Sequence, residues 1–326
     1  MVSTARNKRV IVVLAGGVGG ARMAHGLQQV LPPGQLTAVV NTADDFTHYG
    51  LHISPDLDTV MYTLGGIADP VNGWGVAGDT RRTLDAIARY GRDPWFLLGD
   101  QDFATHILRT ERLRDGASLT EVTGELAAAL GIPTPILPIT DDSVATQILC
   151  PEGWLDFQDY FVRRRQADDV LDVRFAGIER ARPSPAVLGA IAAADCIVVA
   201  PSNPIVSIGP ILQTPGILEA LTSVKAPVVA VSPIIGGQAL KGPAANMLRT
   251  LGHEVSALGI AQIYRDVVDG LVIDNADADL APAIEALGPR VLVTNAIMGD
   301  EADRARFAAE VLGFAGSLSP EQAATR

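Results

Sequence analysis

Short apolar segments recur along the chain, and each one ends at glycine, proline, aspartate or asparagine before a more polar stretch begins. The apolar residues in these segments are continuous rather than alternating, which is typical of strands buried on both faces of a parallel sheet. An amphipathic segment at 22–31 separates the first two and is predicted to be a helix. The strands predicted in this way span 9–15, 36–41, 95–98, 196–200, 227–231, 270–273 and 291–294.

This alternation of strands and helices predicts a doubly wound α/β sheet, a Rossmann-like three-layer αβα fold with mostly parallel strands. One domain is expected over 8–316. Residues 113–185 break the alternation with prolines, aromatic residues and charges, so an inserted or capping region is predicted there. The tail, 317–326, is predicted to be disordered.

Composition narrows the class of protein. The 326 residues suffice for one large domain, and no apolar stretch reaches the roughly 18 uncharged residues of a membrane span. The apolar part of the N-terminal stretch is also too short for a signal peptide. A net charge of −12 argues against a nucleic-acid-binding surface. Cys150 and Cys196 are too few for a disulfide framework, so a reduced, cytoplasmic protein without membrane contact is expected.

Four glycines, Gly16, Gly17, Gly19 and Gly20, follow the first predicted strand in the stretch VVLAGGVGGAR. The dinucleotide-binding pattern G-x-G-x-x-G does not fit, because Arg22 stands where the third glycine belongs. A P-loop does not fit either, since no Gly-Lys-Ser/Thr follows. The glycines still predict a tight turn or a close approach of something to the backbone.

Acidic residues follow the second predicted strand, at the edge where open α/β sheets bind ligands. The stretch NTADDF contains Asp44 and Asp45, and SPDLDT contains Asp56 and Asp58 after a Ser-Pro pair that predicts a helix start. At about 100° per residue the second pair lies on nearly opposite helix faces, so only one of the two is expected to face the cleft. Each acid alone is also an ordinary turn or capping residue. Together, without a His or Cys cluster, they suit Mg²⁺, as in phosphoryl-transfer sites.

Later loops add polar candidates. In APSNPIVSIGPIL, Ser202 and Asn203 stand between two prolines and Ser207 precedes a predicted helix, so they either present donors to a ligand or form a structural turn. In SPIIGGQALKGPA, Lys241 follows paired glycines and either neutralises a phosphate or is solvated. In WFLLGDQDFATH, His106 is a catalytic candidate or an ordinary helical histidine.

Six stretches in this order closely resemble the 2-phospho-L-lactate transferase family of coenzyme F-420 biosynthesis: LAGGVGGAR, NTADDFTHYGLHISPDLDTVMYTLGG, WFLLGDQDFATH, PITDD, APSNPIVSIGPIL and SPIIGGQALKGPA. The likeness runs over about 10–313. It implies a Rossmann-like, cytoplasmic enzyme that forms a homodimer. Such enzymes take the deazaflavin Fo and a guanylyl diphosphate-linked three-carbon acid. The terminal ribityl hydroxyl of Fo attacks the phosphorus that bears the acid, and GMP leaves.

The resemblance also implies roles for the acids. Asp44 and Asp58 are expected to hold Mg²⁺, with Asp45 and Asp56 as supports, and one carboxylate of this catalytic group is expected to orient the attacking hydroxyl. Asp44→Asn and Asp58→Asn are each expected to lower turnover by orders of magnitude while the fold stays intact.

For the substrates, the resemblance implies that the four glycines let backbone amides meet the diphosphate, so that Gly19→Val weakens nucleotide binding. Thr42 and His48 are candidates for substrate contact, and Trp74 is a candidate stacking surface for the deazaflavin. The nucleotide side is expected to be held by Ser202, Asn203 and Ser207, with Lys241 at a phosphate.

Two other functions remain open from the residues alone. A nicotinamide-dependent oxidoreductase would use Asp44 on a ribose, but the missing third glycine and the surplus of acids disfavour it. A non-catalytic regulatory protein that binds guanine nucleotides is expected to lack the acids that this chain keeps. Among lactyl, enolpyruvyl and glyceryl donors, a composition rich in Ala, Gly and Asp favours the phosphoenolpyruvate-derived one, although no single residue decides it.

Overall fold

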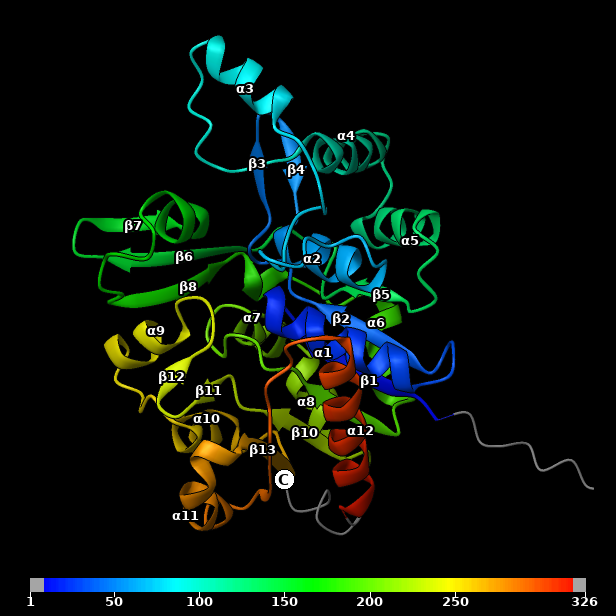
Figure 1. The fold of residues 1–326 in the computed structure, drawn as a ribbon, viewed down its shortest axis with the longest axis vertical. Helices are drawn as coiled ribbons and strands as arrows, with labels where there is room; N and C mark the ends of the chain where they lie inside the picture. Colours follow the sequence, from blue (N-terminus) through cyan, green and yellow to red (C-terminus); the bar gives the residue numbers. More distant parts are fainter. Residues whose placement is uncertain (1–8, 319–326) are drawn as a thin grey trace, which may run out of the picture.

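The computed structural model describes residues 9–318, and a seven-stranded parallel sheet forms its centre. The strand order is β14-β13-β10-β9-β1-β2-β5, and every neighbouring pair is parallel. Helices cover both faces of this sheet, so the Rossmann-like three-layer fold is confirmed (Figure 1). Its strands are β1 (Ile11–Ala15), β2 (Leu36–Val40), β5 (Ile136–Pro138), β9 (Cys196–Val199), β10 (Val228–Val231), β13 (Gly270–Asp274) and β14 (Arg290–Thr294).

The continuous apolar character of β1 has a direct structural reason. Val13 packs into the cluster on one face of the sheet, while Val12 and Leu14 pack into the cluster on the other. The first cluster includes side chains of α1 (Gly17–Val30), α2 (Pro55–Leu64), α5 (Leu119–Ala129) and α12 (Glu301–Ser317). The second includes side chains of α6 (Pro185–Ala192), α7 (Ile208–Gln213), α8 (Ile217–Ser223), α9 (Ala244–Thr250), α10 (Ala257–Tyr264) and α11 (Ala281–Glu285).

One predicted strand of the central sheet is wrong, and one strand of the sheet was not predicted. Residues 95–98 form no strand, because Phe96 and Leu98 pack instead in a separate apolar cluster with the hairpin of β3 (Phe46–His48) and β4 (Leu51–Ile53). The edge position belongs to β5, whose three residues are too short a run to stand out by periodicity. The first helix also begins at Gly17 rather than at residue 22, since the glycines form its first turn.

The middle region, 113–185, divides into two parts. Strand β5 belongs to the main sheet, and α5 packs on one face of it. In contrast, β6 (Ala145–Cys150), β7 (Gly153–Asp156) and β8 (Asp172–Ala176) form a small antiparallel sheet. Figure 1 shows this small sheet standing beside the central one. A π-helical turn, η1 (Asp159–Arg163), follows β7. Only this second part is an insertion into the α/β alternation.

An arm projects from the body at the top of Figure 1. It contains the hairpin of β3 (Phe46–His48) and β4 (Leu51–Ile53), with α3 (Arg82–Arg89) and α4 (Asp100–Arg114) beside it. The remaining elements are β11 (Ile234–Ile235), β12 (Gln238–Ala239), η2 (Ile178–Arg180) and η3 (Asn275–Leu280).

The predictions about membrane spans, cysteines and the C-terminal tail can be compared with the structure. Within residues 9–318 no helix is long and apolar enough to cross a membrane. Cys150 and Cys196 are both buried and free. Of the predicted tail, Ser317 is the last residue of α12, and 319–326 lie outside the described residues.

The strand order changes direction between β1 and β9. From β1 the chain builds outward through β2 and β5, and from β9 it builds outward the other way through β10, β13 and β14. Such a switch point leaves a crevice at the carboxyl ends of the strands, where α/β proteins bind ligands. The glycine loop follows β1, and the loop 201–207 follows β9.

Candidate active site

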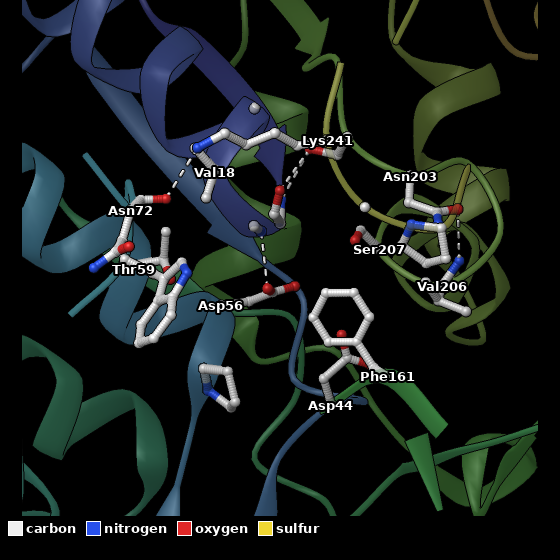
Figure 2. A pocket seen from close by; sticks show the side chains of 18 of the residues that line it. Val18, Asp44, Asp56, Thr59, Asn72, Phe161, Asn203, Val206, Ser207 and Lys241 are labelled. Atoms are coloured by element: carbon white, nitrogen blue, oxygen red, sulfur yellow. Dashed lines mark hydrogen bonds between the residues drawn. The ribbon is translucent and has the colours of Figure 1, made fainter. Parts of the chain in front are cut away.

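A cavity of about 640 Å³ opens at this switch point. Its size suits a ligand as large as a nucleotide or a cofactor. The glycine loop, three of the four predicted acids and the loop after β9 line it, together with residues from the loop after α2, from the η1 segment and from the loop before α9 (Figure 2). The chain therefore brings its candidate residues to one place from segments far apart in sequence.

Asp56 holds the first turn of α1. The Gly17 amide donates to its Oδ1 at 2.8 Å, and the Asn41 side-chain amide donates to its Oδ2 at 2.9 Å. A carboxylate at a helix N-terminus is stabilised by the unpaired amides there. Burial nevertheless dominates and raises the pKa of Asp56 to about 6, although these two hydrogen bonds oppose the rise. Asp56 thus supports the glycine loop directly.

Three of the four glycines allow the loop after β9 to pack against α1. The Ser202 hydroxyl donates to the Gly16 carbonyl at 2.8 Å and accepts from the Gly16 amide at 3.2 Å. A Cβ built on Gly19 would lie 2.2 Å from the Pro201 carbonyl oxygen, and one on Gly20 would lie 2.8 Å from the Ser202 hydroxyl. The space beside Gly19 is therefore taken by Pro201, which is a packing reason for a glycine at this position.

Asp44 is a buried carboxyl group that forms no ion pair with a basic side chain among residues 9–318. The Thr146 hydroxyl donates to its Oδ1 at 3.0 Å, and the Gln158 side-chain amide donates to its main-chain carbonyl at 3.4 Å. Burial, and then the charge of Asp56, raise the pKa of Asp44 well above its usual range. Among the described ion pairs, no lysine or arginine pairs with either carboxylate. A buried carboxyl group that a neutral hydroxyl contacts fits a hard cation such as Mg²⁺.

Asp58 differs because its charge is already balanced. Both oxygens accept from the buried guanidinium of Arg109, at 3.1 Å from Nη1 and in a closer contact with Nη2. His106 lies next to this pair, with its Nε2 3.2 Å from Asp102, which also accepts from the Tyr62 hydroxyl at 2.7 Å. Ligand atoms of Asp58, Asp102 and His106 lie within 4.8 Å of one another, but the guanidinium supplies the positive charge there. Asp58 and His106 both line the cavity.

Three other predicted residues lie outside the cavity wall. Asp45 accepts from the Ser54 hydroxyl at 2.7 Å and contacts His52 Nε2 at 3.0 Å, and burial raises its pKa against those two contacts. Thr42 is buried, and His48 packs in an aromatic cluster of the arm. Ser54 begins α2 as predicted, but its hydroxyl bonds to Asp45 rather than capping the helix. Asp45, Thr42 and His48 are thus not among the residues that line this cavity.

The remaining predicted residues line the cavity. Asn203 accepts from the amides of Ile205 and Val206 at 2.9 and 3.4 Å, which makes the turn after β9 rigid. Ser207 precedes α7, and its hydroxyl does not cap that helix. The Lys241 ammonium donates to the Asn72 carbonyl at 3.0 Å, so two loops meet across the cavity (Figure 2). Trp74 also lines the cavity and is 42% exposed.

Several residues that contact the predicted acids were not predicted from the sequence. Arg109, Thr146 and Gln158 contact the acids, yet they lie 51 to 114 positions away in the chain and belong to no motif. Asn41 had a usable signal, since it is the polar residue that ends a buried strand within NTADDF.

Comparison with known proteins agrees with this geometry. A family model described as 2-phospho-L-lactate transferase CofD matches residues 11–291. The chain belongs to the CofD family. It is therefore a transferase of the CofD type, and the resemblance drawn from the six stretches is confirmed.

Individual CofD-type relatives cover nearly the whole chain. It is 42% identical over 311 residues to the phosphoenolpyruvate transferase of Streptomyces griseus, covering 94% of this chain and 98% of the relative. It is 43% identical over 278 residues to the 2-phospho-L-lactate transferase of Methanosarcina mazei, covering 85% and 91%. A solved member of the upf0052 family from Bacillus halodurans shares the fold at 16% identity and a TM-score of 0.60, covering 93% of this chain and 98% of that one.

Proposed function

We propose that this chain transfers a phospholactyl, phosphoenolpyruvyl or phosphoglyceryl group from a guanylyl diphosphate-linked donor to the ribityl hydroxyl of Fo, with release of GMP, in coenzyme F-420 biosynthesis. The observation that carries the proposal is one cavity in which the N-terminus of α1 meets buried carboxylates that lack a basic partner. A helix N-terminus suits a diphosphate, and the carboxylates suit the cation that a diphosphate brings. The names of the relatives place phosphoenolpyruvate and phospholactate transfer in this family.

Mg²⁺ is the proposed cofactor, with Asp44 and Asp58 as its ligands. Asp44 fits because it is buried and pairs with no basic side chain in the described part of the chain, 9–318, and Asp58 lines the same cavity with lone pairs left after its bonds to Arg109. Asp56 is expected to act as a support, since its oxygens hold Gly17 and Asn41. A bound Mg²⁺ supplies charge stabilisation for phosphoryl oxygens.

The remaining residues of the cavity are proposed to bind different parts of the donor substrate. Amides of the first turn of α1 and the Lys241 ammonium bind phosphate oxygens, while Asn203 and Ser207 face the nucleotide. Ser202 acts through the glycine loop, because Gly16 takes both of its hydrogen-bonding roles. A carboxylate that lines the cavity is proposed to orient the attacking hydroxyl, and Asp44 and Asp58 meet that condition whereas Asp45 does not.

The test is mass spectrometry of the purified protein with Fo, Mg²⁺ and each of the three guanylylated acids, with a chelator control. We expect a phosphodiester product together with GMP, and its formation should stop when the metal is removed. The mass of the product identifies the three-carbon acid. Sequence identity does not, because it is 42% to a phosphoenolpyruvate transferase and 43% to a 2-phospho-L-lactate transferase. Bound guanine nucleotide without product from any donor would contradict the proposal and favour the regulatory alternative.

The resemblance also implies a homodimer, while the cysteines favour the cytoplasm and the net charge of −12 disfavours a nucleic-acid partner, and these stay predictions. Light scattering on the purified chain measures the first. A monomer at micromolar concentration would contradict it.

A further inference from the structure

One wall of the cavity is aromatic and belongs to the inserted segment. Phe161 lines the cavity, and its ring stacks on Phe157, with centroids 5.4 Å apart and planes 6° from parallel. Phe157 is itself only 7% exposed. Figure 2 shows the Phe161 ring standing beside Asp44. The cavity thus presents a flat apolar face, backed by a second ring, next to the proposed reacting centre.

The backbone that carries Phe161 is held from both sides. It lies in η1, whose wide turn is closed by the Arg164 amide bonding to the Asp159 carbonyl at 2.9 Å. Single π-helical turns are rare and are frequently found at functional sites. Toward the arm, the Arg163 guanidinium sits 4.6 Å from the centroid of the Trp95 ring and pairs with Asp93 at 3.1 Å. The aromatic face therefore has a defined orientation before any ligand binds.

Below η1, an apolar cluster joins the small sheet to the main domain. Phe157 and Ile148 of the inserted segment pack in one cluster with Val206, from the loop after β9, and with Met247 of α9. Phe161 packs against the edge of that cluster. The position of the ring is thus coupled to the loop that carries the proposed nucleotide-binding residues.

The same segment also positions Asp44. Gln158, three residues before Phe161, donates to the Asp44 main chain, and Thr146 of β6 donates to its carboxylate. A ring that lies on Phe161 is therefore adjacent to the acid (Figure 2).

We propose that Phe161, stacked on Phe157, is the surface on which the flat heteroaromatic ring of the acceptor lies, and that it selects acceptors by their ring. This inference rests on the proposed function. An aromatic face attracts a planar heteroaromatic ring through offset stacking and apolar contact. Trp74 lines the cavity from the loop after α2, but no described aromatic ring packs behind it, so it is less fixed than Phe161.

The experiment measures the dissociation constant of Fo by its fluorescence, and that of GMP by calorimetry, for the wild type and for Phe161→Leu, Phe161→Tyr and Trp74→Leu. Leucine keeps the apolar volume and removes the ring, whereas tyrosine keeps the ring. We expect Phe161→Leu to weaken Fo binding about tenfold or more, the size of one lost stacking contact. Phe161→Tyr and GMP binding should stay within about twofold of the wild type on the same scale.

Trp154→Leu is the matched control, because Trp154 is a 37% exposed aromatic residue of the same small sheet outside the cavity. Three results would overturn the inference: unchanged Fo affinity in Phe161→Leu, an equal loss of Fo and GMP binding in that variant, or a larger loss of Fo in Trp74→Leu. Failure of the proposed function looks different, because the wild type itself would then bind no Fo. Circular dichroism of each variant confirms that the fold is retained.

Discussion

The amide of Gly17 donates a 2.8 Å hydrogen bond to the carboxylate of Asp56, so the N-terminus of α1 is already in contact with an anion of the protein itself. A diphosphate that approaches the same helix end meets the charge of Asp56 as well as the free amides. Protonation of Asp56, or a cation near it, removes that repulsion. We therefore expect the proposed diphosphate substrate and the proposed Mg²⁺ to favour each other's binding.

The raised pKa of Asp56 gives the free protein a specific pH dependence. Its folded-state pKa is about 6 against the ordinary 3.8, so the folded state binds the proton more tightly than the unfolded state does. This stabilising contribution is complete below about pH 4 and is lost as pH rises through about 6. At most it amounts to about 3 kcal/mol.

We expect the free energy of unfolding in urea, measured with a chelator, to fall more between about pH 4 and 7 in the wild type than in Asp56→Asn. The asparagine keeps an oxygen for the Gly17 amide and removes the titration. Equal slopes in both proteins would contradict this account of Asp56.

Asp44→Asn should remove most of the turnover and leave the fold in place. The loss should be about 100-fold or more in kcat, because fixed charges at a phosphoryl-transfer site carry a large share of the rate. The amide oxygen can still accept from Thr146, so the thermal midpoint should change little. Isothermal titration should show weaker Mg²⁺ binding.

Asp266→Asn, on an 84% exposed side chain far from the cavity lining, is the control for that substitution. Full turnover in Asp44→Asn would remove Asp44 from the proposed metal site.

Asp58→Asn should mainly destabilise the protein, contrary to the expectation from sequence that the fold stays intact. It leaves the fully buried guanidinium of Arg109 without its carboxylate, and breaking a buried pair costs about 3–5 kcal/mol. Urea denaturation measures the effect. The matched control is Glu125→Gln, which breaks the exposed pair with Arg112 and should cost no more than about 1 kcal/mol. Equal stability losses in the two variants would show that the Asp58–Arg109 pair is not structural.

Gly19→Ala should reduce stability before it affects any ligand. The added Cβ would lie 2.2 Å from the Pro201 carbonyl oxygen, so α1 and the loop after β9 must separate, at a cost of about 1–3 kcal/mol. Gly124→Ala in α5 is the control, since a Cβ there meets nothing within 4 Å, and alanine should stabilise that helix by up to about 1 kcal/mol. A Gly19→Ala protein of normal stability with weak nucleotide binding would restore the diphosphate explanation.

Much of the architecture is predictable from local patterns. Continuous apolar runs located most of the central strands, and the Ser54–Pro55 pair located the start of α2. The same reasoning failed at 95–98, where an apolar run packs in the arm, and at β5, whose run is too short. In both cases the decision depends on which neighbour buries the segment, and local sequence does not contain that information.

The site shows the same division. That glycines, acids and a Pro-Ser-Asn-Pro turn gather at one edge follows from sequence, because the carboxyl ends of parallel strands all meet there. Tertiary contacts decide which acid pairs with a basic residue. Arg109 of α4 pairs with Asp58, whereas Thr146 and Gln158 of the inserted segment contact Asp44. Periodicity and turn signals are properties of neighbouring residues, whereas charge, burial and stacking in a cavity depend on which distant elements pack together.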